Sequence, residues 1–197
     1  MYSVVEIEED LKKELKKKRF RHSVGVQYTS ICLAMRYGES LEKASYAGIL
    51  HDCAKGMKDE KLLEICRKQD LPVTEAEKES PYLLHGRVGA WVSQEKYGIT
   101  DSDILGAVTW HTTGKPAMSL LEKIVFTADY IEPGRDTAPD LDTIRQMAFT
   151  DLDQAIYMIL KQTLDYLKED GRPIDPSTEI TYNYYKQLIH IVQEDNE

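Results

Sequence analysis

Two imidazoles and two carboxylates in this sequence have the types and the order of a metal-binding set. His22 stands alone, the adjacent pair His51-Asp52 follows it, and Asp129 comes much further along the chain. Imidazole and carboxylate groups together suit Fe, Mn, Co and similar divalent ions, which keep open positions for water and phosphate. These four residues are therefore candidate metal ligands. On residue types alone the alternatives are a capping or core imidazole for His22 and an ordinary helix C-terminal carboxylate for Asp129, and a lone His-Asp pair is not specific.

Asp129 ends the apolar run IVFTADYI, which is an unfavourable place for a free carboxylate. A buried charge is costly unless it is paired or bound to a metal, and the C-terminus of a helix is the negative end of its dipole. This mismatch favours a cationic partner for Asp129. His51 and Asp52 are about 100° apart on a helix, but both can reach one ion near the helix terminus.

The elements that must position these residues are helical. The segments between turn residues have helical periodicity, without sustained alternation of strand type, repeats or linkers. Gly38 is a natural C-cap, Ser40 is a suitable N-cap, and Thr100 or Asp101 can cap a later helix. The sequence predicts an all-α helical bundle, a single domain over residues 1–197. The expected helices cover about 5–17, 20–38, 40–53, 59–69, 83–97, 101–111, 118–131, 140–149, 151–169 and 177–193.

The charge balance is acidic, because 25 Lys and Arg residues against 34 Asp and Glu residues give a net charge of −9. Such a chain has no general attraction for nucleic-acid polymers or anionic membranes, so neither is an expected partner. No apolar run reaches about 18 residues, and the N-terminal segment lacks the apolar stretch of a signal peptide. Cys32, Cys53 and Cys66 form no C-x-x-C pair, which argues against a disulfide framework and for a cytoplasmic location.

Longer stretches of the chain carry a more specific resemblance than the His-Asp pair does. The four candidate ligands resemble the H…HD…D signature of the HD superfamily of helical phosphohydrolases. More narrowly, the chain is similar to the HD-type symmetrical bis(5′-nucleosyl)-tetraphosphatases, so the expected fold is an HD-domain helical bundle. The matching stretches, between residues 19 and 178, are RFRHSVGV, AGILHDCAKG, LLHGRVGA, HTTGKPAMSLLEKIVFTADYIEPGR and GRPIDPST.

The resemblance implies a metal-dependent hydrolase that cuts dinucleoside polyphosphates, chiefly diadenosine tetraphosphate, symmetrically into two ADP. It also implies iron at the four ligands, with Mn, Co or Ni as alternatives. The implied catalytic residues are Asp52, His85 and His111. The residues implied to contact phosphate or nucleotide are Lys55, Gly56, His85, His111, Thr112, Arg135, Arg172, Pro173, Ile174, Asp175, Pro176 and Ser177.

The residue types agree with these roles. Lys55 adjoins Gly56, which lets the backbone approach an anion, and Arg135 has the planar fork that binds phosphate well. By contrast, His190 lies in LIHIVQ, matches none of the stretches, and is expected to have a surface or packing role.

Some assignments stay open. His85 and His111 are favoured as phosphate contacts, and ligands of a second metal are the alternative. Either histidine could assist the leaving group, and Asp52 could orient the attacking water. The rival functions are another HD phosphohydrolase, acting on (deoxy)nucleotides or cyclic dinucleotides, and a non-catalytic nucleotide sensor. A homodimer is also open.

Overall fold

The computed structural model describes the backbone of residues 1–194 and the side chains of residues 1–189. This part of the chain is helical and contains no strand, which confirms the predicted all-α class. The elements are α1 (Val4–Glu14), α2 (Lys17–Tyr37), α3 (Leu41–Leu50), α4 (Asp59–Lys68), α5 (Glu75–Glu79), η1 (Pro81–Leu84), α6 (His85–Glu95), α7 (Ser102–Trp110), α8 (Leu120–Ile131), α9 (Leu141–Ala148), α10 (Leu152–Glu169) and α11 (Pro176–Glu194).

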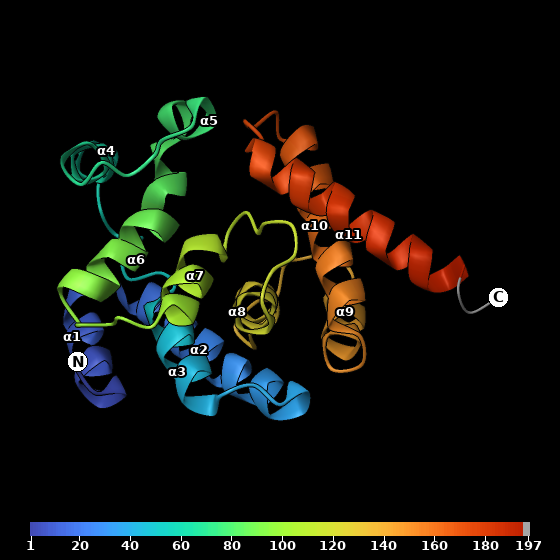
Figure 1. Cartoon of the computed structure of the whole chain (residues 1–197), viewed down its shortest axis with the longest axis horizontal. Helices are drawn as coiled ribbons and strands as arrows, with labels where there is room; N and C mark the ends of the chain where they lie inside the picture. The colour runs from blue at the N-terminus through green and yellow to red at the C-terminus, as the bar shows by residue number, and fades with distance from the viewer. Residues whose placement is uncertain (195–197) are drawn as a thin grey trace.

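Helix α8 is the interior element of the bundle. It is seen nearly end-on in Figure 1, between α2, α3 and α7 on one side and α10 on the other. Its sequence LLEKIVFTADYI is apolar almost all round, and Ile124, Val125 and Ala128 are fully buried. A helix that is apolar on most faces belongs inside a bundle. Because α8 is buried, Asp129 in its C-terminal turn lies in the interior of the bundle.

Side-chain caps fix where several helices begin. Ser40 accepts a hydrogen bond from the backbone of Lys43, and Asp101 accepts from Asp103 and Ile104, so both predicted N-caps are confirmed. Ser119 and Glu122 form a reciprocal capping box at the start of α8. Gly38 ends α2 with φ 77°, a left-handed conformation that glycine adopts without strain.

Helices α2 and α3 cross closely at Gly48. A Cβ atom at this position would lie 2.7 Å from the Cα of Gln27, which is too close for two carbon atoms. The missing side chain therefore allows the two helices that carry His22 and His51 to come together.

The structure corrects some predicted boundaries. Helix α3 ends at Leu50 rather than near Cys53, and residues 51–57 form tight turns. The second helix begins at Lys17 rather than near Phe20. Helix α5 and the short η1 were not predicted, because EAEKE contains no apolar period and is held by the capping box of Thr74 and Glu77.

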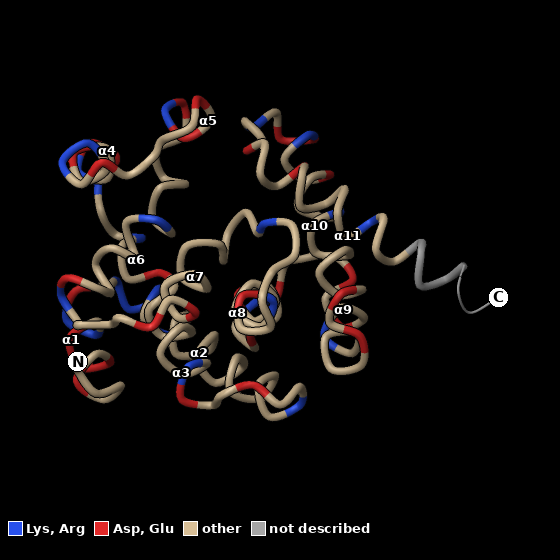
Figure 2. The backbone as a smooth tube through the Cα atoms, in the orientation of Figure 1, with Lys and Arg blue, Asp and Glu red and all other residues tan. Residues whose placement is uncertain are grey.

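Charged residues of both signs are mixed along the surface helices. Figure 2 shows this mixture on α1, α4 and α5. Long-range attraction of a polyphosphate by the whole acidic molecule is therefore not expected, and cations close to the site must supply it. Among the helices that the structure describes, none is long and apolar enough to cross a membrane.

Candidate metal centre and nucleotide site

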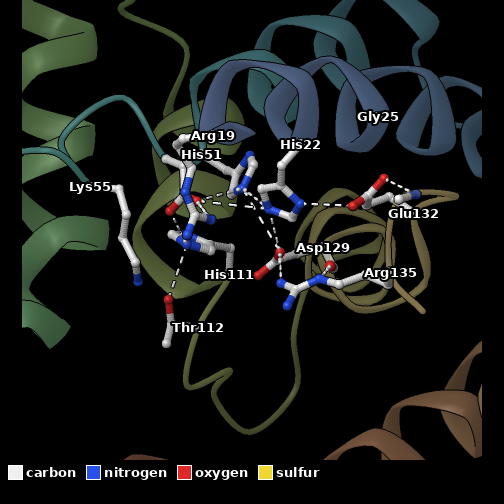
Figure 3. Close-up of polar contacts among 12 residues, drawn as sticks. Arg19, His22, Gly25, His51, Lys55, His111, Thr112, Asp129, Glu132 and Arg135 are labelled. Carbon is white, nitrogen blue, oxygen red and sulfur yellow. Dashed lines mark hydrogen bonds and ion pairs between the residues drawn. The ribbon is translucent and has the colours of Figure 1, made fainter. Parts of the chain in front are cut away.

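Side chains from α2, from the turn that follows α3, and from α8 converge at the first predicted ligand set. The Nε2 atom of His22 lies 2.9 Å from Oδ1 of Asp129 and 3.3 Å from Nε2 of His51. These three ligand atoms all lie within 4.8 Å of one another, a spacing that allows one ion to contact all of them. Asp52 adds Oδ2 at 3.4 Å from Nε2 of His51 and 3.8 Å from Nε2 of His22. The structure thus brings the four predicted ligands together, and Figure 3 shows three of them, His22, His51 and Asp129.

Two further histidines face the other side of Asp52. Its Oδ1 atom lies 3.3 Å from Nε2 of His85 and 3.6 Å from Nε2 of His111. The two histidine Nε2 atoms are 3.0 Å apart. His51, Asp52 and His111 form a second group of ligand atoms within 4.8 Å of one another. One carboxylate therefore lies between two histidine pairs and presents one oxygen to each.

The tautomers of the histidines follow from the partners of their Nδ1 atoms. In His51, His85 and His111 this atom lies 2.7, 2.6 and 2.7 Å from the backbone carbonyls of Gly48, Tyr82 and Val108, respectively. A carbonyl only accepts, so each Nδ1 carries the proton and each neutral ring has an unprotonated Nε2. Three lone pairs and a carboxylate thus face one another at short range. Such an arrangement needs a cation or a shared proton.

The protonation states also favour a cation. Burial raises the pKa of Asp52, but His51, His111 and His85 outweigh burial and hold the pKa well below its usual range. Burial is likewise outweighed at Asp129 by His22, His51 and Arg135, so its pKa is also held well below the usual range. For His85, burial lowers the pKa to about 4, which keeps this ring neutral at pH 7. Burial lowers the pKa of His22, but hydrogen bonds to Asp129 and Glu132 outweigh burial and raise it. Two ionised carboxylates among imidazole rings fit a divalent cation, which can replace the ring protons that these carboxylates attract.

Comparison with known proteins agrees with this geometry. The family model described as HD domain matches residues 19–134, which include all six residues of the cluster. The chain belongs to the HD-domain family. It is 41% identical to the symmetrical bis(5′-nucleosyl)-tetraphosphatase of Bacillus subtilis, over 88% of this chain and 92% of that protein. The corresponding protein of Staphylococcus aureus is 38% identical, over 93% of this chain and 95% of its own length.

A crystal structure supports the assignment to the HD-domain family. It is the structure of a Clostridium acetobutylicum protein described as a predicted HD superfamily hydrolase involved in NAD metabolism, and it matches with a TM-score of 0.92 and 40% identity. The match covers 95% of this chain and 99% of that one. The family recognised from the sequence and the HD-domain helical bundle are both confirmed.

The HD centre is the cluster of His22, His51, Asp52, His85, His111 and Asp129. Two residues that contact it were not predicted from the sequence. Arg19 donates a 2.5 Å hydrogen bond to Oδ2 of Asp52, and Oε1 of Glu132 lies 3.0 Å from Nδ1 of His22. Both residues stand in the stretches RFRHSVGV and ADYIEPGR that carried the resemblance. Their position beside His22 and Asp129 was the available signal. Their partners are distant in sequence, and no periodicity pointed to these contacts.

Several predicted nucleotide contacts border the HD centre. The Lys55 ammonium lies 3.1 Å from Nε2 of His85, and burial lowers its pKa. The hydroxyl of Thr112 lies 3.1 and 3.0 Å from Nε2 of His85 and His111, respectively. Arg135 donates to Oδ1 of Asp129 at 2.9 Å and to its backbone carbonyl at 3.1 Å. Gly56 has open space where a side chain would be.

The predicted contacts in the tail are distributed over two places. Asp175 and Ser177 line a narrow cavity together with Thr112, so this part of the tail adjoins the HD centre. Arg172 instead pairs with Asp170 and lies over the ring of Tyr166, 5.7 Å from its centroid. Pro173 and Ile174 lead into α11, which begins at Pro176. The side chain of His190 lies outside the described residues.

Proposed function

We propose that this chain hydrolyses dinucleoside tetraphosphates, chiefly diadenosine tetraphosphate, symmetrically to two ADP. The observation that carries the proposal is the convergence of four histidines on the ionised carboxylates of Asp52 and Asp129. Two cations, Lys55 and Arg135, border this cluster. The proteins to which the chain is similar over most of its length are named as symmetrical bis(5′-nucleosyl)-tetraphosphatases. An HD centre with adjacent cations suits a polyphosphate substrate.

The first ion would be held by His22, His51, Asp52 and Asp129. The mixed nitrogen and oxygen donors suit iron, which we propose as the native metal, with Mn, Co and Ni as alternatives. When bound, a divalent ion would polarise a phosphoryl oxygen and lower the pKa of a coordinated water.

The geometry also favours a second ion. The Nε2 atoms of His85 and His111 and Oδ1 of Asp52 form a set of possible metal ligands, because the Nδ1 atom of each ring donates to a backbone carbonyl and leaves Nε2 of the neutral ring unprotonated. As plain phosphate contacts, neutral histidines would present lone pairs to an anion, which is repulsive. A cation between the rings and the phosphate removes that conflict. We therefore prefer the second-ion alternative for His85 and His111.

Other residues near the metal ligands would neutralise the charge of the tetraphosphate or position Asp52. Lys55 and Arg135 would offset the negative charge that spreads over the phosphate oxygens during transfer. Arg19 holds Oδ2 of Asp52 and fixes the carboxylate between the two histidine pairs. Asp52 would thereby orient the attacking water as well as bind metal. Thr112 could donate its hydroxyl proton to a phosphate oxygen once the histidine nitrogens bind an ion.

Reaction in water enriched in heavy oxygen tests the proposal. Attack on the second phosphorus from one nucleoside releases the other half as ADP. The label should therefore enter the terminal phosphate of one ADP in each pair. AMP and ATP as the main products contradict symmetrical cleavage. The His51→Ala variant, prepared in the same way, shows whether a contaminating hydrolase produces the ADP.

A nucleotide panel distinguishes the rival functions. Faster turnover of a deoxynucleotide or a cyclic dinucleotide would assign the chain to a different HD phosphohydrolase. Tight binding of ADP without turnover of any substrate, in metal-loaded protein, would assign it to a nucleotide sensor.

The proposed function also implies the partners and the cellular location of the enzyme. Its partners would be the nucleotide substrate and ADP, with neither a nucleic-acid polymer nor a membrane. We propose a cytoplasmic location, which the free thiols of Cys32, Cys53 and Cys66 suit. A homodimer stays open and is decided by the mass of the protein in solution.

A further inference from the structure

A large groove lies beside the HD centre, between the end of α8, the loop that follows it, and α10. Its volume is about 840 Å³, within the range of small-molecule sites. Tyr130, Arg135, Met158, Gln162 and Tyr166 are among its lining residues. In Figure 1 the two helices that contribute to it, α8 and α10, are neighbours.

Arg135 connects this groove to the HD centre. Arg135 lines the groove, and its guanidinium donates to Oδ1 of Asp129 at 2.9 Å. Figure 3 places Arg135 on one side of Asp129, and Lys55 and Thr112 on the other. A polyphosphate lying across the centre would therefore have one end near Thr112 and pass Arg135 at the other end. The groove is where that second end would continue.

The lining of the groove suits a nucleoside. Tyr130, Met158 and Tyr166 offer flat or apolar surface, and the Tyr166 side chain is well exposed, with the residue 54% accessible. Exposed aromatic rings stack on bases of any sequence. Tyr130 donates its hydroxyl to Oε1 of Gln162 at 2.7 Å, so polar groups suited to ribose hydroxyls lie next to an aromatic ring.

The charges of the groove argue against a terminal phosphate there. Asp140, Asp165 and Glu169 line it, against the cations Arg135 and Lys161. Lys161 is itself 3.4 Å from the carboxylate of Asp165, which offsets its charge. Beyond Arg135 the groove is therefore acidic on balance. A free phosphate would be repelled, whereas an uncharged nucleoside would not.

We propose that this groove binds the second nucleoside of the dinucleoside polyphosphate and so selects substrates with a nucleoside at both ends. The proposal rests on the proposed function and adds a residue, Tyr166, whose ring stacks on the base with the face opposite Arg172. The HD centre binds the phosphates, and the groove binds the nucleoside attached to their far end.

Steady-state kinetics of Tyr166→Ala test this with two substrates in metal-loaded protein. Diadenosine tetraphosphate has a second nucleoside, and adenosine 5′-tetraphosphate has a free phosphate in its place. Loss of one base–aromatic stack should lower kcat/KM for the dinucleotide by roughly 10-fold. The value for the mononucleotide should change by less than about 2-fold, because its single nucleoside is expected to use the other end of the site. Tyr166→Phe should restore dinucleotide turnover, since it keeps the ring.

Tyr28→Ala is the matched control, because Tyr28 is a similarly exposed tyrosine on α2, outside the groove. Equal losses on both substrates, or no loss on either, would show that Tyr166 does not contact a second nucleoside and overturn the proposal. These outcomes leave symmetrical cleavage by the wild-type protein intact. Wild-type protein that fails to cleave diadenosine tetraphosphate would instead contradict the proposed function, and the groove proposal with it.

Discussion

Glu132 and His22 form a carboxylate–histidine pair behind the candidate metal centre, with Oε1 of Glu132 lying 3.0 Å from Nδ1 of the ring. Glu132 is only 4% exposed, and its second oxygen accepts a 2.6 Å hydrogen bond from the backbone of Gly134. A Cβ atom on Gly25 would overlap this carboxylate, so the glycine provides its space. The pair fixes the Nδ1–H tautomer of His22 and turns Nε2 towards Asp129.

Replacing Glu132 should weaken metal binding without removing any direct ligand. Loss of such an outer partner typically costs about 10–100-fold in metal affinity, which we expect for Glu132→Ala. Glu132→Gln keeps an acceptor oxygen and should lose less, and Gly25→Ala should resemble Glu132→Ala because it displaces the carboxylate. Competition with a fluorescent chelator measures the affinity. Wild-type metal affinity in Glu132→Ala would show that the pair does not position His22.

Removing a direct ligand should abolish metal binding at its site. His51→Ala and Asp129→Ala are expected to lose the first ion and nearly all turnover, whereas His111→Ala should reduce two bound ions to one. Metal content measured by mass spectrometry checks both statements. Asp136→Ala removes an exposed carboxylate from the neighbouring loop and should leave the metal content unchanged. Stoichiometric metal in Asp129→Ala would refute the four-ligand site.

The two cations at the margin should matter for nucleotide affinity rather than for metal content. Lys55→Ala and Arg135→Ala are each expected to weaken ADP binding by roughly 1–3 kcal/mol, the scale of a lost charge-assisted hydrogen bond. Calorimetric titration of metal-loaded protein measures the change, with the exposed neighbour Lys58→Ala as control. Unchanged affinity in both variants would make these residues ordinary surface cations.

The crossing of α2 and α3 should be intolerant of a side chain at Gly48. Gly48→Ala forces a methyl group against the backbone of Gln27 and is expected to lower the free energy of unfolding by about 1–3 kcal/mol. Denaturant unfolding measures this. Gly56→Ala is the matched control for stability, since a Cβ atom there meets nothing within 4 Å. Equal stability of the two variants would contradict the close crossing.

The three thiols should differ in reactivity. Cys32 is exposed, whereas Cys53 is buried and its burial raises the pKa of the thiol to about 12. A thiol with a raised pKa is protonated and unreactive at lower pH. Alkylation at pH 8 followed by mass spectrometry should therefore modify Cys32 and spare Cys53 until the protein is denatured. Rapid modification of Cys53 in native protein would show that this region opens.

The sequence predicted the elements whose signals are local. Ser40, Asp101 and Gly38 end or begin helices as expected, because capping depends on residues a few positions away. Helix α5 was not predicted because it is short and polar and has no apolar face. The capping box of Thr74 and Glu77 and the ion pair of Glu77 with Arg87 hold this helix in place.

The candidate site was predictable only in part for a related reason. The residue types of His22, His51 and Asp129 indicate metal binding, and the fold brings them together as expected. Which oxygen of Asp52 faces which histidine depends on how four helices and a turn pack, so it could not be read from the chain. The groove at Tyr166 was equally hidden, because aromatic residues on a C-terminal helix are usually explained by packing.

The HD centre and the groove lie in different parts of the chain. All six residues of the HD centre fall between His22 and Asp129, within the span that matches the HD-domain family, while the groove is formed by Tyr130 and residues beyond it. On our proposals, hydrolytic chemistry and choice of substrate are encoded in consecutive segments, joined at the end of α8. Evolution could exchange or reshape the second segment and redirect an intact reaction centre to another phosphate ester. An engineer could do the same by recombining chains after Gly134, which keeps Glu132 and its partner Gly134 with His22.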